Sequence, residues 1–187
     1  MANTCFTTYR IVPSDVNKDA FNKLIDALSK FADWQIHLGD LADELGVEWR
    51  NKGYSVRGKI VYWKERQGVI FMDVESAWSA CDDLFEDINK TLSKGLSISY
   101  REEEPGCGIF YIHDERGFFP DNYFVDAYGG DFECSYFETL EEVIDYWCKC
   151  MKCGRGDKTD EQMRAIIEEW EYDDDDTFFF IHEFTRC

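Results

Sequence analysis

Three cysteines in the C-terminal half of the chain have a spacing that could hold a metal ion. Cys148, Cys150 and Cys153 include one Cys-x-x-Cys pair, and structural zinc sites commonly combine such a pair with two further ligands. Cys134 or His113 could complete the set. However, a second Cys-x-x-Cys pair is missing, and Cys148 continues the apolar face of a predicted helix, where a free cysteine is an ordinary core residue. We therefore expect no metal, no other cofactor and free thiols.

Motifs of the common enzyme classes are absent from the sequence. It contains no Gly-x-x-x-x-Gly-Lys phosphate loop, no Gly-x-Ser-x-Gly nucleophile elbow and no His-Glu-x-x-His pair. Three histidines are present, and His182 lies in an apolar run, where a buried structural histidine is the ordinary case. The sequence thus identifies no catalytic residue and predicts a non-enzymatic protein. A zinc-dependent enzyme that uses the cysteine cluster is a third hypothesis, after the two described below.

Carboxylates are concentrated in the C-terminal part of the chain. Residues 100–187 carry 24 Asp and Glu against 8 Lys and Arg, a net charge of −16 out of −19 for the whole sequence. Such an acidic region repels nucleic acid and anionic membranes, and it attracts basic surfaces over a long range. The predicted contact carboxylates are Glu102, Glu103, Glu104, Glu168, Glu169, Glu171, Asp173, Asp174, Asp175 and Asp176, with aromatic contacts from Tyr136, Trp170 and Tyr172.

These acidic groups suggest a partner of a particular chemistry. A carboxylate array matches the phosphate spacing of a duplex only approximately, yet it can occupy the Lys/Arg groove of a nucleic-acid-binding complex. The expected partner is therefore a basic nucleic-acid-binding protein or ribonucleoprotein, with no direct binding of nucleic acid or membrane. The alternative is that the acidic runs are solvated surface that confers solubility only.

A predicted hairpin at residues 54–74 is locally basic and offers a second function. Its candidate ligand-binding residues are Arg57, Lys59, Trp63, Lys64 and Arg66. A basic sheet hairpin with an aromatic side chain could hold RNA or an anionic metabolite. The ordinary interpretation is a solvated edge, where Lys discourages edge-to-edge pairing.

The first hundred residues have the pattern of a βαββαβ unit. Alternating or β-rich segments predict strands at 5–12, 54–63, 69–74 and 96–101, and a turn separates the middle two. Apolar stripes with helical spacing run over residues 21–31 and 78–92, and a short polar helix is expected at 39–46. We expect an α+β fold in which two helices cover one face of a four-stranded antiparallel sheet, the ferredoxin-like arrangement.

The rest of the chain predicts an acidic α/β extension. Strands are expected at 108–113, 123–128 and 132–137, and capping boxes at Thr139–Glu142 and Thr159–Gln162 open two helices. Thr177–Thr185 is apolar on both faces and therefore predicts a buried strand, central in a sheet. The expected organisation is a ferredoxin-like unit at 1–105 and an extension at 106–187 packed on it.

Three short segments resemble the YubB ferredoxin-like family of phage and plasmid proteins. They are Met1-Ala2-Asn3-Thr4-Cys5, Glu75-Ser76-Ala77-Trp78-Ser79, and Tyr100 followed by Glu103-Glu104-Pro105-Gly106. The resemblance covers about residues 1–112, and the family's Trp and paired prolines are replaced by Thr4 and Ala80-Cys81. It implies a mobile-element origin and no particular activity. In that setting the expected partner is a host-defence protein, such as a CRISPR effector with a positively charged guide–target channel.

The sequence also bears on the compartment. Residues 1–5 have neither the basic start nor the apolar run of a signal peptide, and no segment reaches the length of a membrane span. We expect a cytoplasmic protein, in the host cytoplasm if a phage encodes it. The eight scattered cysteines are then expected to be reduced.

Overall fold

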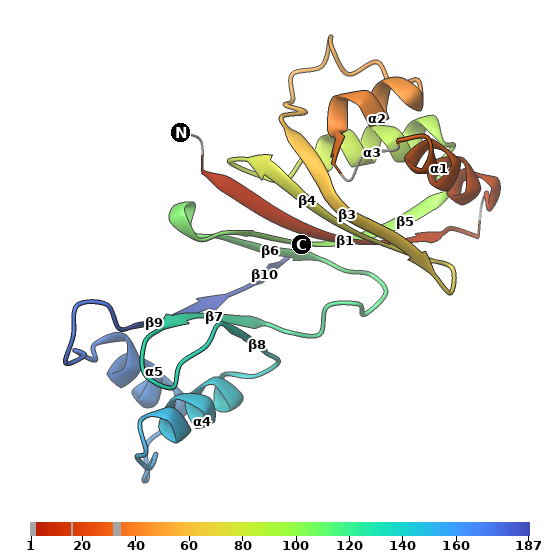
Figure 1. The fold of residues 1–187 in the computed structure, drawn as a ribbon. Coiled ribbons are helices and arrows are strands. Elements are labelled where there is room, and N and C mark those ends of the chain that lie inside the picture. Colours follow the sequence, from red (N-terminus) through yellow and green to blue (C-terminus); the bar gives the residue numbers. More distant parts are fainter. Residues whose placement is uncertain (1–2, 16, 32–34) are drawn as a thin grey trace. The chain divides into compact units, whose positions relative to one another are not determined.

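The fold is α+β and divides into two compact units (Figure 1). It is known from a computed structural model that describes residues 3–15, 17–31 and 35–187, so Met1 and Ala2 of the first YubB-like segment lie outside the described residues. Unit 1 comprises Met1–Phe119 and Arg186–Cys187, and unit 2 comprises Pro120–Thr185. No helix within the described ranges combines the length and the apolarity that crossing a bilayer requires.

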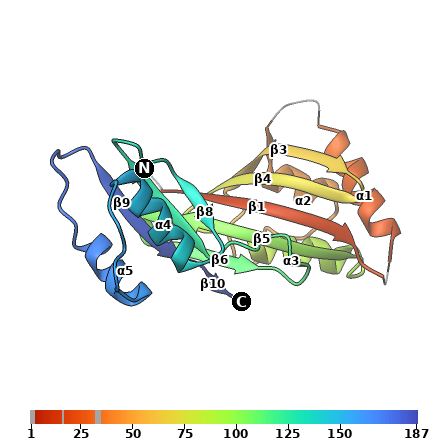
Figure 2. The same ribbon diagram turned by 90° about the horizontal axis from the view of Figure 1, so that it is seen from below.

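Unit 1 is built on a seven-stranded sheet with the order β10-β6-β5-β1-β4-β3-β2, and Figure 2 shows the long strands side by side. Neighbouring strands pair antiparallel in every register that is defined. The hairpin between β3 and β4 turns at Gln67 and Gly68, whose φ angles of 54° and 77° suit a tight two-residue connection. The strands are β1 (Thr4–Pro13), β2 (Ile36–His37), β3 (Gly58–Arg66), β4 (Val69–Ala77), β5 (Leu96–Glu104), β6 (Ile109–His113) and β10 (Thr185–Arg186).

Helices α1 (Asp19–Ser29), α2 (Leu38–Glu44) and α3 (Asp82–Thr91) lie on one face of this sheet (Figure 1). Alternate residues of β1 and β4 point toward them and are buried, which fits the period of two along a strand. The core joins helix residues such as Leu24 and Phe85 to strand residues such as Tyr9, whose ring lies 4.2 Å from that of Phe85. A short 3-10 turn, η1 (Pro105–Cys107), connects β5 to β6.

Unit 2 has a core of its own, formed between a three-stranded sheet and two helices. The sheet has the order β8-β7-β9, with β8 (Ser135–Phe137), β7 (Tyr123–Tyr128) and β9 (Phe178–Glu183). Helices α4 (Leu140–Cys150) and α5 (Asp160–Glu168) cover one face and contribute Trp147 and Ile167 to the core. Both capping boxes predicted from the sequence are confirmed, at Thr139 with Glu142 and at Thr159 with Gln162.

Three sequence expectations about the C-terminal part differ from the structure. Residues 177–185 do not form a buried central strand, because β9 is at an edge of its sheet and the Phe180 side chain is 56% exposed. Apolarity on both faces of a strand does not fix how many neighbours it has. The strand expected at 132–137 shortens to β8, and Phe132 instead joins the helix-covered core. In addition, β6, which the sequence analysis assigned to the extension, pairs with β5 in the sheet of unit 1.

Candidate functional site

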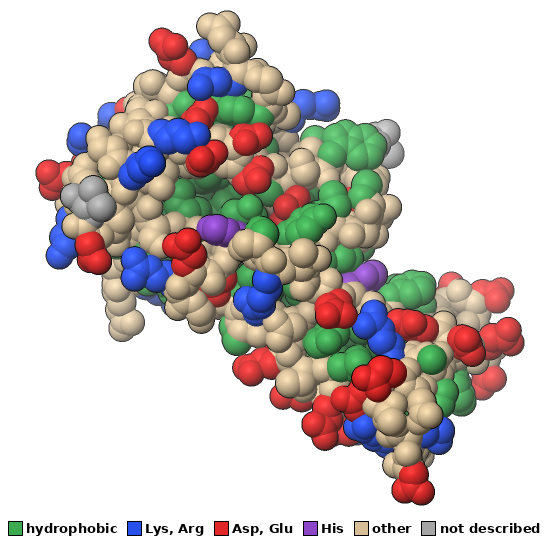
Figure 3. Space-filling view, turned by 180° about the vertical axis from the view of Figure 1, so that it is seen from behind, with side chains coloured by type: hydrophobic (Ala, Val, Ile, Leu, Met, Phe, Trp, Pro, Cys, Tyr) green, Lys and Arg blue, Asp and Glu red, His purple; other side chains and the backbone are tan. Residues whose placement is uncertain are grey.

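Unit 2 carries most of the negative charge of the protein. Its residues 120–185 include 19 Asp and Glu against 5 Lys and Arg, a net charge of −14. Unit 1 holds the other 20 Asp and Glu and 15 Lys and Arg, a net charge of −5. In Figure 3, carboxylates outnumber Lys and Arg side chains over unit 2. The negative electrostatic potential of the protein therefore originates mainly from this unit.

The acidic residues predicted at the C-terminal end of α5 and after it are exposed. Among the described residues only Glu168 of this set has an ion pair, with Arg164 at 2.7 Å. Asp174 has a structural role, because its Oδ1 accepts hydrogen bonds from the backbone N–H groups of Thr177 at 2.7 Å and Asp176 at 3.1 Å. Hydrogen bonds from Thr177 lower the pKa of Asp174, so the segment keeps a defined shape and its charge. The exposed carboxylates are those of Glu168, Glu169, Glu171, Asp173, Asp174, Asp175 and Asp176. We call this set the acidic segment.

Glu102 and Glu104, also predicted as contact residues, are not on the surface. They are 7% and 3% exposed, whereas Glu103 is half-buried and its carboxylate lies 2.8 Å from Arg101. The sequence predicts a fourth strand at 96–101 that is closed by the acidic run, but pairing with β1 and β6 extends β5 through this run to Glu104. Alternation along the strand then turns Glu102 and Glu104 inward. The Glu102–Glu104 run is therefore removed from the candidate interaction surface.

The predicted aromatic contacts of unit 2 are exposed to different degrees. Trp170 is 43% exposed and packs edge-on against Trp147, with ring centroids 5.3 Å apart. Tyr172 is half-buried, and its hydroxyl accepts a hydrogen bond from the indole N–H of Trp147 at 3.3 Å. Trp170 and Tyr172 line a groove of about 450 Å³ together with acidic residues. Tyr136 is 39% exposed but lies on β8, outside that groove. The acidic groove residues are Asp131, Glu171, Asp173 and Asp174.

Sequence reasoning missed two of the most exposed aromatic residues of unit 2. Tyr128 on β7 is 63% exposed and Phe180 on β9 is 56% exposed. Both alternate with buried neighbours, Ala127 and Phe179, so the alternation was present in the sequence. Phe180 was nevertheless assigned to a strand buried on both faces, because the four residues Phe178–Ile181 are all apolar.

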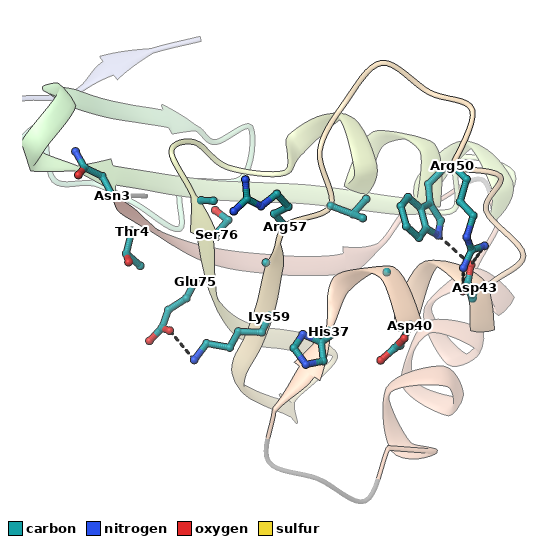
Figure 4. A pocket seen from close by; sticks show the side chains of 15 residues that line it. Asn3, Thr4, His37, Asp40, Asp43, Arg50, Arg57, Lys59, Glu75 and Ser76 are labelled. Carbon is teal, nitrogen blue, oxygen red and sulfur yellow. Dashed lines mark hydrogen bonds and ion pairs between the residues drawn. The ribbon is translucent and has the colours of Figure 1, made fainter. Parts of the chain in front are cut away.

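The basic hairpin residues do not form one surface. Arg57 and Lys59 line a pocket of about 660 Å³ in unit 1 with His37 and Trp49 (Figure 4). By contrast, Trp63 packs against the core of unit 1. Lys64 and Arg66 are exposed further along β3 and are not part of this pocket. The predicted set therefore divides between a pocket, a core position and an exposed strand end.

Charges in this pocket are mostly paired. The Lys59 ammonium lies 2.9 Å from the Glu75 carboxylate, and the Arg50 guanidinium lies 2.5 Å from that of Asp43 (Figure 4). Among the Lys and Arg side chains of the pocket, Arg57 differs, because its guanidinium forms no ion pair within the described part of the chain; the Asp40 carboxylate also lines the pocket without an ion pair there. Arg57 is thus the group with most capacity to bind an anion here.

The cysteines of α4 point in different directions. The backbone N–H of Cys153 donates to the carbonyl oxygen of Cys148 at 3.0 Å, and burial raises the pKa of the Cys148 thiol to about 11, with the neighbouring Cys153 acting in the same direction. Cys150 instead donates to the backbone carbonyl of Asp131 at 3.4 Å. Cys134 donates to Asp126 at 3.6 Å, while His113 lies 3.2 Å from the carbonyl oxygen of Cys187. Cys150 and Cys153, the Cys-x-x-Cys pair, therefore do not act together as two ligands of one site. No group of three or more potential metal ligands occurs within the part of the chain that the structure describes.

One thiol in unit 1 contacts a carboxylate. Cys5 donates to Glu102 Oε1 at 3.5 Å in the interior of the unit. Burial raises the pKa of Cys5 to about 12, and the neighbouring Glu102 charge acts in the same direction. A thiol that remains protonated is a poor nucleophile, so this contact has the character of a structural hydrogen bond.

Comparison of the chain with family models, with curated proteins and with solved structures gave no match. Function is therefore inferred from the chemistry of the described residues. Exposed carboxylates beside exposed aromatic rings bind cations, because the charges attract them and the rings provide contact area.

Proposed function

We propose that this chain is a non-enzymatic interaction protein whose acidic segment binds a basic nucleic-acid-binding protein and excludes nucleic acid from it. The observation that carries the proposal is the exposure of the acidic segment in a unit of net charge −14. Most of these carboxylates have no counter-charge within the described residues, so crowding them raises the energy of the free protein. Contact with a cationic surface removes that repulsion.

Charge and aromatic contacts have separate roles in this proposal. Carboxylates at the rim of an interface act largely through the rate of association and through the choice of partner. Tight binding needs a few buried contacts as well, and Trp and Tyr are among the residues that supply them most often. The groove next to the acidic segment offers Trp170, which is 43% exposed and held in place against Trp147.

We propose further that part of unit 1 has the ferredoxin-like arrangement. The order β5-β1-β4-β3, with α1 and α3 on one face, supports it. Together with the three segments that resemble the YubB family, this favours a mobile-element protein. A host-defence effector with a positively charged channel is a partner of the required chemistry.

A displacement assay tests the main proposal. Labelled single-stranded RNA is bound to an arginine-rich peptide, and the full chain is added while fluorescence anisotropy reports RNA release. We expect the wild-type protein to displace the RNA, and a variant with four neutralised residues of the acidic segment to displace it much less. This acid variant is Glu169→Gln, Glu171→Gln, Asp173→Asn and Asp175→Asn, which leaves Asp174 in place.

The matched control neutralises four exposed carboxylates of unit 1 instead. It carries Asp15→Asn, Asp19→Asn, Asp26→Asn and Glu48→Gln, so its net charge equals that of the acid variant. We expect the control to displace RNA almost as well as the wild type. Equal losses in both variants would show that only net charge matters, and the proposed surface would then be rejected.

A second function is favoured by one observation, the guanidinium of Arg57 in the unit 1 pocket. An anionic small molecule could pair with it, with His37 and Trp49 as further contacts. The probe is inorganic pyrophosphate, and the readout is the thermal midpoint of the full chain. Stabilisation of the wild type that is lost in Arg57→Gln and kept in Arg66→Gln supports this site. No stabilisation of the wild type counts against it.

A further inference from the structure

We infer that the free edge of β9 is the place where the basic partner docks, and that an extended arginine-rich segment of the partner adds there as a further strand. This inference rests on the proposed function and specifies the form of the partner. Three features of unit 2 carry it: the position of β9 in its sheet, the exposed aromatic rings on and beside β9, and the carboxylates that precede it.

The sheet order leaves β9 with one neighbour. β9 pairs with β7 over six residue pairs, from Tyr128 opposite Phe178 to Tyr123 opposite Glu183. No second strand pairs with β9 within the described residues. In an antiparallel pair, alternate residues direct their N–H and C=O groups away from the partner strand, so an edge strand presents hydrogen-bonding groups to an additional strand. Six residues suffice for a peptide to add in this way.

Aromatic side chains line the face of β9 that the helices leave open. Phe178 and Phe180 alternate with the buried Phe179, and their rings lie 5.4 Å apart. Tyr128, opposite Phe178 on β7, continues the row with a ring distance of 6.3 Å. Guanidinium groups stack on such rings, with a favourable separation within about 6 Å. Arginines at alternate positions of an added strand would meet this row.

The charges beside β9 select a cationic occupant. Asp173–Asp176 ends two residues before β9 begins, and Asp126 lies opposite Phe180 in the sheet. A second copy of this chain would bring two units of net charge −14 together, and like charges at that density repel. Edge strands are usually protected by Lys, Pro or a short length, and β9 contains neither of those residues. The surrounding carboxylates discourage self-association and still admit a basic chain.

Two peptides of equal length and charge test the inference on the full-length protein. One is an eight-residue peptide of alternating Arg and Thr, which can pair as a strand. In the other, Pro replaces every Thr, which removes backbone donors and disfavours a strand. We expect the Arg–Thr peptide to bind about tenfold more tightly in fluorescence anisotropy, since strand pairing adds to the shared charge attraction. We also expect it to slow amide hydrogen exchange in β9.

Substitution of an exposed ring gives an independent measurement. Phe180→Ser should weaken binding of the Arg–Thr peptide several-fold and leave the Arg–Pro peptide unaffected. Tyr62→Ser is the matched control, because Tyr62 is an exposed aromatic residue of a strand in unit 1, 47% exposed. Circular dichroism checks that both variants fold, and hydrogen exchange in the wild type remains decisive if one does not.

The outcomes separate the inference from the proposed function. Equal affinity of the wild type for the two peptides, or no added protection of β9, overturns the edge site. If the acid variant loses both peptides in that case, the proposed function still stands. If the acid variant binds both peptides as tightly as the wild type, the proposed function itself fails.

Discussion

Glu102 is a buried carboxylate that its surroundings only partly compensate. Its Oε1 accepts hydrogen bonds from the backbone N–H of Ala80 at 2.7 Å and from the thiol of Cys5 at 3.5 Å. Burial raises the pKa of Glu102 despite these hydrogen bonds, because a charged group loses its hydration in the interior. The ionised form is therefore less favourable in the folded than in the unfolded chain.

Glu102→Gln should stabilise the protein above the unfolded-state pKa of a glutamate. The folded pKa is raised, so the wild type loses stability as the pH rises through the interval between the unfolded and the folded pKa. Gln is neutral and keeps an oxygen for the Ala80 N–H, so it does not incur this loss. We expect the variant to have a higher urea midpoint than the wild type at about pH 8. The difference between the two midpoints should become smaller toward about pH 5. Glu169→Gln, which neutralises an exposed carboxylate, is the control, and a wider difference between wild type and Glu102→Gln at acidic pH would refute the explanation.

The cysteines of α4 should bind no structural metal. Cys148 is buried and Cys150 donates to a backbone carbonyl, and no group of three or more potential ligands occurs among the described residues. We expect the purified protein to contain substoichiometric zinc and to keep its melting temperature in the presence of EDTA. Stoichiometric zinc together with unfolding on chelation would contradict this, since a structural zinc ion contributes directly to folding.

At the scale of elements, the capping boxes of unit 2 were predictable because their signal is local. The Thr139 hydroxyl oxygen accepts a hydrogen bond from the backbone N–H of Glu142 at 3.2 Å, and the Glu142 carboxylate accepts one from the backbone N–H of Thr139 at 3.1 Å. Both partners lie within one helical turn, so no tertiary information is needed to find them. The same holds for Thr159 and Gln162 at α5.

Removing one capping side chain tests this energetically. Thr139→Ala should lower the free energy of unfolding by about 1 kcal/mol. The backbone N–H of Glu142 loses its acceptor, the Thr139 hydroxyl, and the reciprocal capping box is no longer complete. Thr139→Ser keeps the hydroxyl and should be nearly neutral. Urea denaturation followed by far-UV circular dichroism measures the stability of both variants, and equal stabilities for Ala and Ser would be inconsistent with the cap.

Features that depend on strand neighbours were not predictable in the same way. The acidic run at Glu102–Glu104 looked like a solvated loop, but strands on both sides of β5 extend the ladder and bury alternate residues. For β9 the error went in the opposite direction, because the apolar run Phe178–Ile181 does not indicate on which side a neighbouring strand is missing. The acidic segment, by contrast, is exposed as expected, because it lies at the end of α5 and in the loop before β9, where no described strand pairs with it.

At the scale of the whole molecule, the uneven distribution of charge should affect stability. The 14 uncompensated negative charges of unit 2 repel one another, and salt screens that repulsion over a Debye length of about 10 Å at 0.1 M. We expect added NaCl to raise the urea midpoint of the wild type, and the acid variant to show a higher midpoint in low salt with a smaller response. A urea midpoint that changes neither with salt nor with the four substitutions would mean that the carboxylates of the acidic segment are too well solvated to repel one another measurably.

The most direct test of the proposed function is the affinity of the full chain for an arginine-rich peptide, measured across a series of salt concentrations. We expect the wild type to bind the peptide tightly at about 50 mM NaCl. Its affinity should fall steeply toward about 300 mM, because salt screens the charges of the acidic segment. The acid variant should bind more weakly and depend less on salt, whereas the unit 1 control should follow the wild type. Identical affinities and salt dependences for all three proteins would contradict the claim that the acidic segment is the binding surface.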